Sequence, residues 1–135
     1  MSTTSLRYGS IVTTSLPYAE AIERAKSLLK DEGFGVLCEI DVAKTLKEKI
    51  GVDFRPYVIL GACNPQFAHQ VLAQEGHVGL LLPCNVVVQR EANGTVVSAV
   101  DALAMLSVVG KPELEPIARE VNARLARVLE RIAGA

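Results

Sequence analysis

Several short stretches of the chain alternate between apolar and polar residues, a pattern typical of β-strands that bury one face. Residues 6–14 are rich in β-branched residues and predict a first strand. Residues 34–40 alternate more regularly and place Cys38 on the apolar face, where we expect it to pack in the core. Residues 57–63 form an unbroken apolar run, which predicts a buried strand.

Other stretches repeat their apolar residues every three or four positions, as amphipathic helices do. Gly33 is suited to end the first of these helices, and Asp41 is suited to cap the second. The predicted helices cover residues 17–32, residues 42–50 and a C-terminal segment that begins after Pro112 or Pro116 and ends at Ile132.

The segment GACNPQFAHQ, residues 61–70, joins a predicted strand to a predicted helix. Asn64 is a good N-cap, because its side chain accepts a hydrogen bond from an amide of the first turn. Pro65 is a good first helical residue, because it has no N–H to leave unpaired. We therefore predict a helix from Pro65 to about Glu75. Asp101 stands at a similar junction, where a cap for a short helical turn and an acid–base role are the alternatives.

The following part of the chain predicts extended structure and a hairpin. Residues 78–91 read as extended chain, in which Pro83 marks an edge, a bend or a bulge. Asn93-Gly94 is a strong signal for a two-residue hairpin turn, and residues 95–100 form the returning strand.

Strands and helices are interspersed, and the hairpin makes at least one strand pair antiparallel. Alternating strands imply a sheet that is covered mainly on one face. We therefore predict a single α+β domain over residues 1–135. It is a two-layer sandwich in which helices pack on one face of a mainly antiparallel sheet.

Composition limits the partners. Half of the 135 residues are hydrophobic, which fits either a well-filled monomer core or a self-association face. The net charge is −1 and basic residues alternate with acidic ones, so we expect no nucleic-acid partner. No apolar run approaches the ~20 residues of a membrane helix, and the polar N-terminus lacks a signal-peptide pattern. With three cysteines, an odd number that fits reduced thiols, we expect a cytoplasmic protein with no membrane partner.

Cys63 and Cys84 are the candidate reactive residues. Cys63 directly precedes the predicted cap Asn64, where unpaired amides and the helix dipole favour an anion and make a thiolate more available. Cys84 lies in a similar Cys-Asn sequence at the start of the next strand. The alternative is that both thiols pack as small apolar side chains.

Two histidines complete the candidate set. On the predicted helix, His69 falls about 130° from the centre of the apolar face, so it faces solvent, a cleft or a partner. His77 follows in a loop, where an ordinary surface position is the alternative. The spacing 63–69–77–84 lacks the paired short intervals of zinc sites, and no phosphate-binding or dinucleotide-binding loop occurs, so we expect no metal and no cofactor. The candidate ligand-binding residues are Cys63, Asn64, His69, His77 and Cys84.

Three sequence blocks carry a family resemblance: LGACNP at 60–65, LLLPCNVVV at 80–88 and AVDALAM at 99–105. Over about residues 10–130 the chain resembles the bacterial and archaeal family called domain of unknown function 302, which commonly has Pro at the position of Ala102. The resemblance implies a compact α+β domain with an antiparallel sheet, similar to the helix-grip or TATA-binding-like arrangement, and a homodimer. It implies no activity.

Three functional hypotheses follow. The first is a homodimeric cytoplasmic module that binds a small anionic or thiol-reactive ligand in a pocket near Asn64 and Pro83. The second is an enzyme or carrier that uses a thiolate in sulfur transfer or redox chemistry. The third is a structural protein-interaction module.

Overall fold

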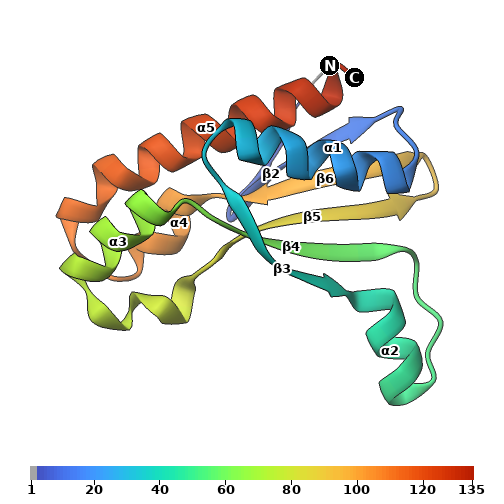
Figure 1. Ribbon diagram of the computed structural model, residues 1–135, viewed down its shortest axis with the longest axis horizontal. Helices are drawn as coiled ribbons and strands as arrows, with labels where there is room; N and C mark the ends of the chain where they lie inside the picture. The colour runs from blue at the N-terminus through green and yellow to red at the C-terminus, as the bar shows by residue number, and fades with distance from the viewer. Residues whose placement is uncertain (1–2) are drawn as a thin grey trace.

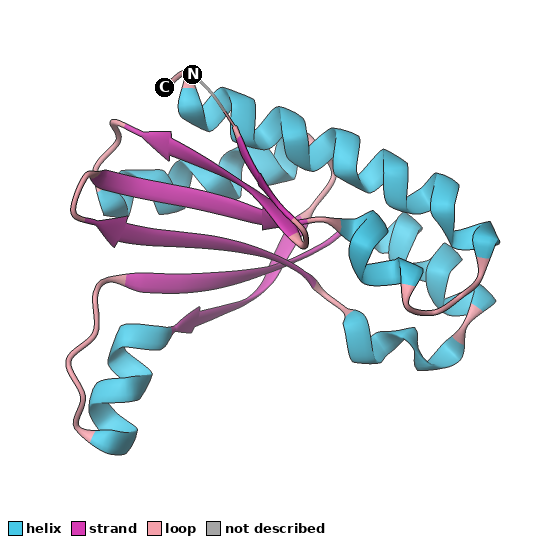
Figure 2. Ribbon diagram, turned by 180° about the vertical axis from the view of Figure 1, so that it is seen from behind, coloured by secondary structure: helices cyan, strands magenta, loops and turns pink. Residues whose placement is uncertain are grey.

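A six-stranded antiparallel sheet forms one layer of the molecule and helices form the other (Figures 1 and 2). The computed structural model describes residues 3–135. The strand order is β1-β2-β6-β5-β4-β3, and all neighbouring strands are antiparallel. The strands are β1 (Thr4–Leu6), β2 (Gly9–Thr14), β3 (Gly35–Asp41), β4 (Tyr57–Cys63), β5 (Cys84–Glu91) and β6 (Gly94–Val100). The predicted α+β class is confirmed.

The helices lie mainly on one side of the sheet, where α1 and α5 run across it, and α2 stands apart at the far end of β3 and β4 (Figure 1). Their bounds are α1 (Tyr18–Asp31), α2 (Val42–Ile50), α3 (Pro65–Gln74), α4 (Ala102–Ser107) and α5 (Glu115–Ala133), with 3₁₀ helices η1 (Gly76–Leu81) and η2 (Pro112–Leu114). Within residues 3–135, no helix is both long and apolar enough to span a membrane.

The core lies between the sheet and the two long helices. Alternate residues of the central strands point into it, and Leu60, Val86 and Val97 have no exposed surface. Leu29 of α1 and Ile132 of α5, also fully buried, belong to the same cluster. Burial of one such side chain contributes about 1.5–3 kcal/mol, so this apolar face is the main source of favourable burial energy in the fold.

Two predicted extended segments are corrected. Residues 6–14 form two strands instead of one, because the chain turns at Arg7 and Tyr8 and β1 folds back on β2. Residues 78–81 are part of η1 and are not extended. Val78 is buried there and Leu81 packs on the core, a spacing of three that matches the three residues per turn of a 3₁₀ helix.

The core position predicted for Cys38 is wrong, because its side chain is exposed. The pairing register of β3 with β4 shifts between Val36 and Cys38. The shift breaks the alternation of side chains between the two sheet faces, on which the prediction for Cys38 rested. β3 is also an edge strand, so only β4 pairs with it.

Asp101 confirms the capping interpretation and ties two helices together. Its carboxylate accepts a hydrogen bond from the Ala104 amide at 3.0 Å and another from Asn122 Nδ2 of α5 at 2.8 Å. Asn122 Oδ1 in turn accepts from the Ala102 amide at 2.7 Å. Burial opposes ionisation of Asp101, but the bonds from Asn122 and from the amides of Ala104 and Leu103 outweigh it and hold the pKa below its ordinary value.

We predict that Asp101→Ala lowers the free energy of unfolding by about 1–2 kcal/mol, because it removes a cap and a partly buried bond to α5. Asp41→Ala is the matched control: Asp41 caps α2 through the Lys44 amide, but its side chain is exposed and it makes no bond to a second helix among the described residues. We expect it to cost less. Urea denaturation at pH 7 measures both, and equal losses would contradict the role of Asn122.

The same carboxylate makes stability depend on pH. Since the folded pKa is lower than the unfolded one, the stabilisation is present above the unfolded value of about 3.9 and is lost as the pH falls through the folded pKa. We expect the stability difference between wild type and Asp101→Asn to shrink from pH 7 to pH 3 in urea titrations. A difference that stays constant with pH would contradict this assignment.

Candidate functional site

The junction between β4 and α3 folds as predicted. Asn64 Oδ1 accepts a hydrogen bond from the Phe67 amide at 3.1 Å, and the Asn64 carbonyl accepts from Ala68. Because Pro65 has no N–H, Gln66 is the one residue of this first turn whose amide lacks a hydrogen bond to residues 3–135. The cap therefore satisfies most of the groups that would otherwise attract an anion to this helix end.

A cavity of about 390 Å³ opens beside this junction. Three of the five predicted site residues line it: Cys63, Asn64 and Cys84. The rest of the wall comes from β3, from α3, from the segment around Pro83, and from α4 and α5. The pocket expected near Asn64 and Pro83 is therefore present.

The two predicted histidines lie elsewhere. His69 is exposed on the outer side of α3, as its position on the helix predicted, and His77 is exposed in η1. Neither residue lines the cavity. In the part of the chain that the structure describes, no group of three or more His, Cys, Asp or Glu side chains is arranged to hold a metal ion.

Cys38 is a wall residue that the sequence analysis missed. It pairs with Gly61 of β4, and its Sγ atom lies directly over the Gly61 backbone. A Cβ atom at position 61 would overlap this sulfur and would come within 2.9 Å of Pro83 Cγ. Glycine at 61 thus lets Cys38 and Pro83 approach β4 closely, and all three cysteines of the chain line one cavity.

The three thiols differ in exposure and acidity. Cys38 is exposed, Cys63 is half-buried and Cys84 is buried. Burial, with a smaller contribution from neighbouring Cys63, raises the pKa of Cys84 to about 11. The Cys84 thiol therefore forms much less thiolate at neutral pH than an exposed thiol does, which speaks against a nucleophilic role.

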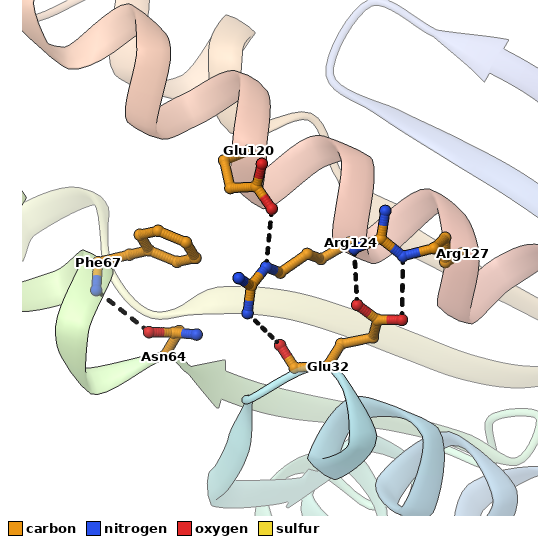
Figure 3. Close-up of polar contacts among 6 residues, drawn as sticks. All are labelled: Glu32, Asn64, Phe67, Glu120, Arg124 and Arg127. Carbon is orange, nitrogen blue, oxygen red and sulfur yellow. Dashed lines mark hydrogen bonds and ion pairs between the residues drawn. The ribbon is translucent and has the colours of Figure 1, made fainter.

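An arginine on α5 fixes the aromatic wall of the cavity (Figure 3). The Arg124 guanidinium carbon lies 4.9 Å from the centre of the Phe67 ring, and Phe67 lines the cavity. Arg124 Nη1 donates to the Glu32 carbonyl at 2.9 Å, and Nε donates to Glu120 at 2.9 Å. Hydrogen bonds to Glu32 and Glu120 thus hold the Arg124 guanidinium outside the cavity. The Phe67 ring lies between the guanidinium and the cavity interior.

The turn after α1 completes this network. Gly33 has φ +86°, and a Cβ atom there would lie 2.8 Å from Asn64 Nδ2 and 3.2 Å from Arg124 Nη1, so a side chain is excluded. Arg127 donates two hydrogen bonds to the Glu32 carboxylate, at 3.1 and 2.8 Å. The bond from Arg127 holds the pKa of Glu32 below its ordinary value.

The cavity itself is neutral and almost entirely apolar. Its lining within residues 3–135 contains no charged side chain, and the one polar amide is that of Asn64, which is 8% exposed. A space of this size and lining suits a small apolar molecule, and the half-buried Cys63 thiol belongs to the same wall. A base positioned to activate that thiol is not among the described lining residues.

Comparison with known proteins confirms the family resemblance. The family model described as domain of unknown function DUF302 matches residues 10–132. The crystal structure of an uncharacterised conserved DUF302 protein from Bacillus stearothermophilus is 40% identical in sequence, with a TM-score of 0.86 over 92% of this chain and 97% of that one. No curated protein matches the sequence.

We predict that the three thiols of the native protein react with iodoacetamide in the order Cys38, Cys63, Cys84. At pH 8, Cys84 is expected to react about 100-fold more slowly than an ordinary exposed thiol, because its pKa lies about two units higher. Peptide mapping by mass spectrometry measures the rates. In guanidinium chloride the three rates should converge, and fast native labelling of Cys84 would contradict its burial.

Proposed function

Because this chain belongs to the DUF302 family, whose description states no activity, we propose a function from its site: the chain is a binding module for a small, mainly apolar ligand. The observation that carries the proposal is the cavity of about 390 Å³, whose wall is apolar apart from Asn64 and the thiols. Pockets of this size and composition hold small molecules through burial of apolar surface.

The uncharged lining of the cavity favours an apolar ligand over an anionic one. An anion needs a cation or several free amides, but Arg124 is engaged by Glu32 and Glu120, and the α3 cap uses most of its first-turn amides. An apolar ligand therefore fits better than an anionic one. A thiol-reactive ligand remains compatible, since Cys63 is half-buried in the wall and reachable from the cavity.

The assembly and the compartment are part of the same proposal. We take the module to be a homodimer, as the family resemblance and the surplus of apolar residues suggest. The three cysteines are free, which supports a reducing compartment such as the cytoplasm.

A thiol enzyme or carrier is the second hypothesis, and the site gives it less support. Cys84 is protonated at neutral pH, and His69 and His77 lie away from the cavity. Iodoacetamide labelling of Cys63 against pH tests the hypothesis directly. Reaction only above about pH 8.5, the value of a free thiol, excludes a thiolate mechanism at this residue.

We predict that the wild-type protein binds the neutral fluorophore Nile red in the cavity and that Ala68→Phe weakens this binding about tenfold or more, because the new ring fills the space. Ala68 is half-buried and lines the cavity. Ala73→Phe is the matched control, since Ala73 is exposed on the same helix and lies outside the cavity wall. Fluorescence titration measures the dissociation constants, and equal weakening by both variants would contradict binding at this site.

The preference for an apolar ligand has its own test. Octanoate and octanamide share a chain and differ in charge, so a cavity without cations should favour octanamide, because burial of an unpaired carboxylate is costly. We expect octanamide to displace Nile red at a lower concentration than octanoate. Clear preference for the carboxylate would restore the anionic ligand of the sequence-based hypothesis.

A further inference from the structure

One segment of the chain contributes no buried residue to the core, and of its side chains only Val36 packs against it. We call residues 35–57 the arm: it comprises β3, α2 and the return to β4, and α2 projects away from the helix layer (Figures 1 and 2). Every residue of the arm is exposed or only partly buried. β3 is paired with β4 and contacts α1, whereas α2 beyond it packs chiefly against β4.

The arm nevertheless carries much of the exposed apolar surface. Half of the large apolar side chains that the described surface exposes lie within it. They are Leu37 (71% exposed), Ile40 (46%), Ile50 (66%), Val52 (43%) and Phe54 (38%). Summed over these side chains, the exposed surface is on the order of 500 Å², more than half of the ~800 Å² that each partner buries in a standard interface.

The helix in the arm needs support that its own chain supplies poorly. α2 packs chiefly against β4 and contains no buried residue. Its ends are capped by Asp41 and by Gly51, which has φ +68°. A capped helix of nine residues is still shorter than the ~12–15 residues at which isolated helices become stable in water.

Charge indicates which partner the arm fits. It contains four acidic residues, Glu39, Asp41, Glu48 and Asp53, and four basic residues, Lys44, Lys47, Lys49 and Arg55. A surface with equal numbers of both signs does not repel an identical surface. It offers no net charge to nucleic acid or to an anionic membrane.

We propose that the arm is the surface through which two copies of this chain associate, each arm covering the apolar side chains of the other. This inference rests on the homodimer of the proposed function and names its contact surface. It also links assembly to the cavity, because Leu37 and Cys38 of the arm line the cavity wall. Association through β3 then steadies that wall.

The decisive experiment compares two exposed apolar positions in the full-length chain. Ile50 lies in the arm and Val108, at the end of α4, lies outside it; they are 66% and 74% exposed. Sedimentation velocity should give wild type twice the chain mass of 14.5 kDa. Ile50→Asp should raise the dimer dissociation constant at least about 100-fold, and Val108→Asp should leave it unchanged. Circular dichroism verifies that both variants fold.

Hydrogen exchange locates the contact independently of mutation. The α2 amides of wild type should exchange more slowly above the dimer dissociation constant than below it. The proposal is overturned if wild type stays monomeric across a 100-fold range of protein concentration that extends to high concentration. The arm would then be a contact surface for a different protein. The proposal is also overturned if Ile50→Asp still dimerises and the exchange rate of its α2 amides does not change with protein concentration.

The Nile red assay separates this inference from the cavity proposal. A wild-type dimer that dissociates on Ile50→Asp but binds no Nile red contradicts the cavity and supports the arm. A monomeric wild type that binds Nile red supports the cavity and contradicts the arm.

Discussion

Burial of one face of the sheet under α1 and α5 determines the arrangement of the strands and of the cavity. Leu60, Val86 and Val97 reach the core only because α1 and α5 cover that face and exclude water from it. Each central strand must then hold one register, since a shift by a single residue would turn its apolar side chains to solvent. Packing of the helices therefore determines the strand register, and the register determines where each strand ends.

The cavity forms where this regular packing ends. At the end of β4 the chain leaves the sheet through the Asn64 cap, and the bulge in β3 brings Cys38 over Gly61. The side chains that meet there come from several elements and do not fill the space between them. Arg124 closes the outer side by stacking on Phe67 while its hydrogen bonds keep its charge out of the interior. Neutrality of the cavity follows from this geometry, and burial of apolar surface is the main interaction that its wall offers.

Local signals predicted the parts of the fold that depend on near neighbours. The caps at Asp41, Asn64 and Asp101 form as expected, because each bond joins a side chain to an amide three residues on. Cys38 departs from its local pattern, because a register shift that depends on β4 reversed the expected burial. Residues 78–81 depart from theirs as well, since they form part of a 3₁₀ helix in which Val78 is buried.

The α+β class, the order of the main elements, the helix starts and the family could be read from the amino-acid order, because periodicity, caps and motifs are properties of contiguous residues. The folded chain was needed to see that Cys63 and Cys84 share a cavity with Cys38 while His69 and His77 face solvent. Those neighbours come from strands distant in sequence, and their approach depends on strand register and on the space left over Gly61. Such distances are set by packing of the whole sheet, which no local pattern encodes.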